Sequence, residues 1–244
     1  MVSAYDLTVV GLSVLLSLGI VGVSFWRKVF VRYIFLNAYL LFSAAFTVGG
    51  VYLLATVGYD SLTYFYFYYV GDSFCNIFGF LLIAGMFDHM FRNSAFRPYV
   101  RPTLGLFFLG VVGASLLVIL RSVNRFSAPG FLVEFQQNMF FVGVLLTFLL
   151  WASMAYLRAE SRQFVLLVSG LGIYFSAHAV NYAVQFLVNS KGVAAALTKV
   201  PPLAYTLMVG LWLYTFLRIP EGAPAVAPAA APREEAVPVR IPSG

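Results

Sequence analysis

Seven long apolar segments run through the chain, and they constrain its fold more than any other feature. Each has roughly 20 residues or more, enough for a helix rising about 1.5 Å per residue to cross the ~30 Å hydrocarbon core of a bilayer. Only 10% of the residues are charged, against about 25% in a soluble domain. The sequence therefore predicts an all-α polytopic membrane protein, a seven-transmembrane-helix bundle with helices at residues 7–26, 31–58, 62–91, 102–120, 131–157, 163–187 and 194–217.

Basic residues are distributed unevenly between the two sides of this predicted bundle. Nine fall on one side: Arg27, Lys28, Arg32, Arg92, Arg97, Arg101, Arg158, Arg162 and Arg218. Four fall on the other: Arg121, Arg125, Lys191 and Lys199. Because cytoplasmic loops carry the excess of Lys and Arg, the first side is predicted to be cytoplasmic and the N-terminus external. No basic residue precedes the first helix, which is therefore interpreted as an uncleaved anchor and not as a signal peptide.

The chain divides into a predicted transmembrane domain, residues 1–218, and a Pro/Ala-rich tail, residues 219–244, that is expected to be a disordered cytoplasmic segment. The expected partners are the lipid bilayer and another membrane or cytoplasmic protein, contacted through the tail and the basic inner loops. The basic positions concerned are Arg27, Lys28, Arg92, Arg97 and Arg101. The cytoplasmic loops account for most of the net charge of +6, so no nucleic acid partner is predicted.

The third apolar segment contains an ionisable residue far from either end. Asp72 lies about ten residues, or ~15 Å, from the outer end of its helix, near the bilayer midplane. A carboxyl group at that depth costs several kcal/mol unless it is paired, protonated or hydrated, so it is a candidate functional group. Asn76 follows one turn later on the same face. Tyr68 and Tyr69 belong to an aromatic run that is typical of an interfacial belt or of the wall of a binding cavity.

The sixth segment carries a polar stripe that recurs at intervals of four, three and four residues: Tyr174, His178, Asn181 and Gln185. Counted from the outer end, His178 is about nine residues, or ~14 Å, deep, which nearly matches Asp72. Two titratable groups at the same depth on different helices predict a hydrogen-bonded pair, since pairing offsets the cost of burying each. This pairing assumes that the third and sixth helices are adjacent.

Two further pairs of polar residues lie four positions apart, on one face of a helix. Glu134 and Asn138 share a face in the polar first turns of the fifth helix, and because a glutamate so close to water costs little, solvation at the interface explains Glu134 better than a site does. Asp88 and Arg92 share a face at the inner end of the third helix, where they can pair, and with His89 they are interpreted as a solvated helix end and not as a site.

The candidate ligand-binding residues all fall in the predicted outer half of the membrane: Asp72, Asn76, Tyr68, Tyr69, Glu134, Asn138, Tyr174, His178, Asn181 and Gln185. Apolar walls with a few convergent polar groups are typical of small-ligand sites. The leading interpretation is a non-enzymatic sensor or small-ligand-binding bundle with a polar cavity in the outer half. One alternative is an accessory or structural subunit of a larger membrane complex, and a lesser one is proton-coupled transport through Asp72 and His178.

Several sharper functions do not fit the residue content. A retinal protein needs a Schiff-base lysine deep in the last helix, whereas Lys199 lies close to its outer end. Paired haem ligation needs two histidines at one level, and His89 and His178 are at different depths. A zinc hydrolase needs at least three convergent protein ligands. We therefore predict no cofactor, no metal site and no catalytic residue.

Three features together resemble a family of small bacterial seven-helix proteins with no assigned function. They are the aromatic run followed by Asp72, the ending Phe87-Asp88-His89-Met90-Phe91-Arg92, and the polar start of the fifth helix at residues 134–138. The resemblance covers most of residues 1–218 and implies the same architecture and a bacterial inner-membrane location. It implies no activity, and the Pro/Ala-rich tail lies outside it.

Overall fold

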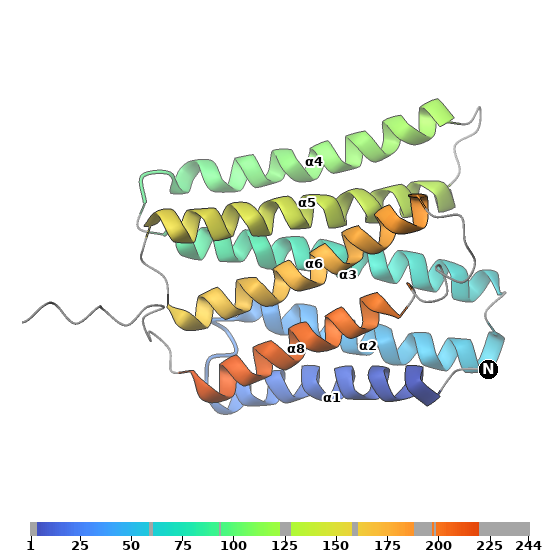
Figure 1. Cartoon of the computed structure of the whole chain (residues 1–244), viewed down its shortest axis with the longest axis horizontal. Coiled ribbons are helices and arrows are strands. Elements are labelled where there is room, and N and C mark those ends of the chain that lie inside the picture. Colours follow the sequence, from blue (N-terminus) through green and yellow to red (C-terminus); the bar gives the residue numbers. More distant parts are fainter. Residues whose placement is uncertain are drawn as a thin grey trace, which may run out of the picture.

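The computed structural model describes residues 4–58, 61–92, 94–122, 128–157, 161–187, 197 and 199–219. This part of the chain forms seven helices and no strands. The helices are α1 (Ala4–Trp26), α2 (Ile34–Val57), α3 (Leu62–Met90), α4 (Arg97–Ser122), α5 (Ala128–Leu157), α6 (Arg162–Leu187) and α8 (Val200–Arg218). They run roughly side by side along the long axis of the molecule (Figure 1).

Six of the helices form a closed ring. Going round it, α1 packs against α2, α2 against α3, α3 against α5, α5 against α6, α6 against α8, and α8 returns to α1. Helix α4 stands outside this ring, where it packs on α5 and more lightly on α3, and it forms the upper edge of the molecule in Figure 1. Helices α3 and α6 therefore lie on different sides of the ring, with α5 between them.

All seven helices are long and apolar enough to cross a membrane. Their outward faces carry large apolar side chains, such as Leu15 on α1, Leu106 and Leu109 on α4, and Phe148 on α5, that are exposed in the isolated chain. A soluble protein would bury such residues, whereas lipid chains solvate them. The length, composition and surface of the helices thus fit a multi-pass membrane protein.

The helix boundaries agree with the predicted segments, with differences at the ends. Helix α4 begins at Arg97, not at residue 102, because Pro98 is accommodated in its first turn and the polar residues before the apolar stretch continue the helix. Helix α2 begins at Ile34, after a turn in which Lys28 adopts a positive φ of 58°. Helix α8 begins at Val200, with prolines in its first turn, and residue 194 of the predicted span lies outside the described part of the chain.

The link between α2 and α3 shows how local sequence sets the packing. Gly58 ends α2 with a φ of +81°, a conformation that favours glycine. Ser61 caps α3 by accepting a hydrogen bond from the Thr63 N–H at 3.2 Å. The short connection makes α2 and α3 neighbours.

The ring is filled by large side chains. Tyr39, Phe140, Phe175 and Trp212 are among its largest fully buried residues, and the Trp212 indole N–H donates to the Leu167 carbonyl at 2.9 Å. Gly143 of α5 faces Phe175 of α6, and a methyl group at that glycine would overlap the phenyl ring. Close packing between α5 and α6 therefore depends on a residue without a side chain at position 143.

Candidate functional site

Asp72 faces the inside of the ring. It is half-buried on α3, one turn from Asn76, and its carboxyl group is within electrostatic range of Tyr174 and Tyr182 on α6. It is also close to Tyr68, which lies on its own helix. These neighbours on α3 and α6 place the Asp72 carboxyl group on the side of α3 that faces the other helices of the ring.

Asn76 is the least satisfied polar side chain beside Asp72. It is 2% exposed, and neither its oxygen nor its nitrogen makes a hydrogen bond to any residue in the described ranges. The Asp72 carboxyl group is close enough to interact with it, but the geometry is not that of a hydrogen bond. An unsatisfied buried amide costs about 1–3 kcal/mol, so this position weakens the fold unless another group reaches it.

Three tyrosines from three helices meet deeper in the ring. The rings of Tyr39 on α2 and Tyr174 on α6 lie 6.4 Å and 6.0 Å from that of Tyr205 on α8. The Tyr205 hydroxyl is 3.1 Å from Ser17 Oγ on α1, which joins a fourth helix to the cluster. The middle of the ring is therefore lined by hydroxyl and aromatic groups as well as by aliphatic ones. We call the region of Tyr39, Asp72, Asn76, Gln136 and Tyr174 the polar interior.

Gln136 ties three helices together in this region. It is fully buried on α5, and its amide nitrogen donates to the Tyr69 carbonyl on α3 at 2.9 Å and to Ser73 Oγ at 3.4 Å. Its amide oxygen accepts from the Tyr182 hydroxyl on α6 at 3.3 Å. Gln136 was not predicted as a site residue. The feature that could have identified it is an amide side chain within the polar first turns of the fifth helix, in a segment otherwise apolar enough to be buried.

The predicted pair between Asp72 and His178 is wrong. Neither a hydrogen bond nor an ion pair joins the two side chains, both of which the structure describes. His178 instead stacks on Phe140 of α5, with ring centroids 4.1 Å apart and planes 13° from parallel, and lies 4.5 Å from the Tyr174 ring. The physical reason is the order of the ring: α5 stands between α3 and α6, and its Phe140 occupies the face of the imidazole.

The other candidates lie in different places. Asn138 donates to Ser115 Oγ on α4 at 3.0 Å, so it joins α5 to the helix outside the ring, and Glu134 lies one turn away on the same face. Asn181 is buried and Tyr68 is exposed, while Tyr69 is half-buried beside it. Gln185 belongs to α6, but its side chain lies outside the described part of the structure.

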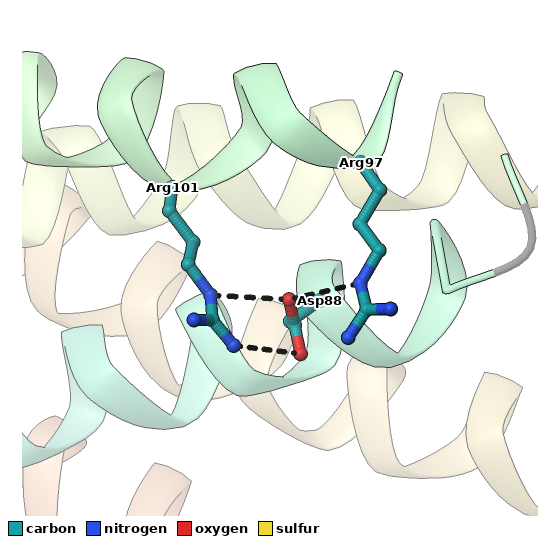
Figure 2. A network of polar contacts seen from close by, with 3 residues as sticks. All are labelled: Asp88, Arg97 and Arg101. Atoms are coloured by element: carbon teal, nitrogen blue, oxygen red, sulfur yellow. Dashed lines mark hydrogen bonds and ion pairs between the residues drawn. The ribbon is translucent and has the colours of Figure 1, made fainter. Parts of the chain in front are cut away.

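The predicted pair between Asp88 and Arg92 is also wrong. Asp88 bonds to Arg101 of α4, whose Nε and Nη2 donate to its two oxygens at 3.2 Å and 3.3 Å. Arg97 adds a longer contact, with its Nε 3.8 Å from the same carboxylate (Figure 2). Because α4 begins at Arg97, Arg97 and Arg101 are one turn apart on the helical face nearest α3. They contact the Asp88 carboxylate in place of Arg92.

The chemistry available to the polar interior is binding by a carboxyl group, an amide, hydroxyls and aromatic faces. Among the residues that can be described, no group of three or more His, Cys, Asp or Glu side chains could hold a metal ion. In comparisons with known proteins, no family model, no curated protein and no solved structure matched the chain. The resemblance to small bacterial seven-helix proteins therefore stays a prediction.

Proposed function

We propose that this protein is a non-enzymatic, small-ligand-binding membrane protein, of the sensor type, with its ligand site in the polar interior. The observation that supports the proposal most is Asn76, a buried amide whose oxygen and nitrogen make no well-formed hydrogen bond to any described residue. It lies one turn from the half-buried carboxyl group of Asp72, which is close enough to interact with it. A ligand that reached both groups would satisfy the amide and offset the cost of burying the acid.

The groups around Asp72 favour a small organic cation as the ligand. Tyr68, Tyr174 and Tyr182 lie near the carboxyl group, and Phe140 and His178 stack next to Tyr174 and Tyr182. An acid supplies the counter-charge for a cation, and aromatic faces attract it through their quadrupoles, most strongly where water is excluded. Apolar walls with a few polar groups are also the usual composition of small-molecule sites.

The proposal includes the orientation predicted from the basic residues. It places the polar interior towards the outside and the end of the bundle that carries Arg32, Arg92, Arg97 and Arg101 in the cytoplasm. A bacterial inner membrane is the location implied by the family resemblance. A sensor arranged in this way would take its ligand from outside and report through the inner loops.

Thermal unfolding of the protein in a maltoside detergent tests this function. We expect choline to raise the Tm of the wild type, because a ligand that binds only the folded state stabilises it. The neutral alcohol in which carbon replaces the ammonium nitrogen should have no such effect. Asp72→Asn should abolish the response to choline, while Asp88→Asn, which removes a carboxylate at the other end of α3, should keep it.

A Tm that does not respond to choline, tetramethylammonium or a simple primary amine would overturn the proposal, as would an equal response of wild type and Asp72→Asn. The accessory-subunit and proton-coupled transport hypotheses stay predictions. Purification in mild detergent separates the first of these from ligand binding, because an accessory subunit would co-elute with a stoichiometric partner.

A further inference from the structure

A cavity of about 780 Å³ opens at one end of the bundle, whereas the polar interior lies in the middle of the ring. It is formed where α2, α4 and α6 begin and α3 ends, on the left in Figure 1. We call this region the arginine-rich end, after the four arginines that line the cavity: Arg32, Arg92, Arg97 and Arg101. From the sequence, the ligand cavity was predicted in the outer half of the membrane, not at this end.

The lining is strongly positive. Four arginines face one aspartate, Asp88, which gives a formal charge of +3 with His89 neutral. In Figure 2, Arg101 holds Asp88 through two nitrogens, whereas Arg97 reaches it through Nε. Asp88 thus fixes the positions of two guanidinium groups but compensates little of the charge. Guanidinium groups are well suited to phosphate, because they offer several N–H donors in a plane.

The backbone adds to this positive potential. Three helices begin at the cavity and one, α3, ends there, so three partial positive charges of helix N-termini outnumber the one partial negative charge of a C-terminus. The first turn of α2, residues 34–36, lines the cavity, and no side chain caps it. Gln163 in the first turn of α6 also lines the cavity. It is 4% exposed.

The remaining walls are apolar, and they open sideways. Leu104, Phe164 and Leu167 line the cavity and are buried. Ile34 and Leu81 also line it, yet they are 43% and 39% exposed on the outer surface of the bundle. A cavity whose apolar wall continues onto the surface that lipid chains contact is accessible from the bilayer as well as from water.

We propose that this cavity binds an anionic phospholipid. The phosphate of its headgroup lies among the arginines and the first turn of α2, and an acyl chain runs along the apolar wall, past Ile34, Leu81 and Gly105, towards the bilayer. The volume falls within the range of about 300–1,000 Å³ that is usual for small-molecule sites. A free phosphate would leave the apolar wall empty, and a zwitterionic lipid would not offset the charge of the lining.

The test is native mass spectrometry of the full chain with added lipid. We expect the protein to bind phosphatidylglycerol more tightly than phosphatidylcholine of the same chain length. Arg92→Gln should weaken phosphatidylglycerol binding by about tenfold, the loss of one charge-assisted contact. Arg162→Gln also removes one positive charge at the arginine-rich end, but Arg162 does not line the cavity. This variant should therefore bind phosphatidylglycerol as tightly as the wild type does.

A second pair of variants tests the acyl chain. Gly105 lines the cavity, and a side chain there would meet no atom within 4 Å of its Cβ, so Gly105→Leu should fold and fill part of the apolar wall. Gly113→Leu, also on α4 and also without a neighbour within 4 Å, lies outside the cavity and is the control. We expect Gly105→Leu alone to weaken phosphatidylglycerol binding, by about fivefold or more, because one leucine side chain fills space that would otherwise hold several methylene groups.

Equal binding of phosphatidylglycerol and phosphatidylcholine would overturn the proposal, because it would indicate ordinary lipid around the helices. Competition by glycerol phosphate at the same concentration as the lipid, with no effect of Gly105→Leu, would also overturn it, in favour of a soluble anion. Thermal unfolding of each variant without added lipid identifies any that fail to fold. None of these results depends on whether choline binds in the polar interior.

Discussion

In the polar interior, Gln136 is fully buried and hydrogen-bonded to neutral groups of α3 and α6, whereas at the arginine-rich end Asp88 and Arg101 form their ion pair at the surface. The first region lies where water is scarce, so each polar group needs a partner from the protein or from a ligand. The second lies where the helices end, and solvent or headgroups can satisfy its charges. The depth of a polar group therefore decides how strongly its removal should change the free energy of unfolding.

The two regions also differ in how tightly their side chains are packed. Gly143 beside the polar interior faces the ring of Phe175, while Gly105 at the arginine-rich end has no atom within 4 Å of the place where its Cβ would be. We expect Gly143→Ala to have the largest effect, lowering the free energy of unfolding by about 1–3 kcal/mol, because overpacking forces helices apart. Gly105→Ala should stabilise by up to ~1 kcal/mol through helix propensity.

Unfolding by SDS in mixed micelles measures both glycine variants under the same conditions. Equal effects of Gly143→Ala and Gly105→Ala would contradict the difference in packing, and would mean that the contact between α5 and α6 relaxes freely around the phenyl ring of Phe175.

Two amides of the polar interior should respond with opposite signs. Gln136→Leu removes the contacts to Tyr69, Ser73 and Tyr182. It should lower the free energy of unfolding by about 1–2 kcal/mol, since hydrogen bonds between membrane helices average about 0.6 kcal/mol each. Asn76→Leu removes an amide that makes no well-formed hydrogen bond to any described residue, and it should raise the free energy of unfolding by about 1 kcal/mol.

The same SDS titration, together with the Tm in detergent, measures these two variants. A loss of stability in Asn76→Leu as large as that in Gln136→Leu would show that Asn76 has a structural partner. The case for a ligand at that position would then lose its main support.

The sequence predicted the helices better than it predicted their neighbours. Length and hydropathy located all seven, because crossing a membrane requires a long apolar segment. Helical spacing correctly placed Asp72 and Asn76 on one face. The pairing of Asp72 with His178 failed because spacing along one helix says nothing about the order of helices in a ring, and α5 separates α3 from α6.

The arginine-rich end was missed for a different reason. A hydropathy pattern detects the apolar part of a helix and not its polar ends, so the fourth helix was expected to begin at residue 102. Beginning at Arg97, it brings Arg97 and Arg101 against Asp88 and forms one wall of the cavity. The basic loops were predicted to contact lipid or a protein, but a cavity between four helices follows from tertiary packing alone.

The smallest expected effect is that of breaking the ion pair at the arginine-rich end. The Asp88 side chain is 29% exposed and that of Arg101 is 74% exposed, so water and salt screen their attraction. Asp88→Asn should lower the free energy of unfolding by about 0.2–1 kcal/mol at low ionic strength and by less in high salt. Unfolding measured at two salt concentrations checks this. A loss above ~2 kcal/mol that persists in high salt would mean that Asp88 depends on its protein partners as strictly as the buried amides do, and that depth does not distinguish the arginine-rich end from the polar interior.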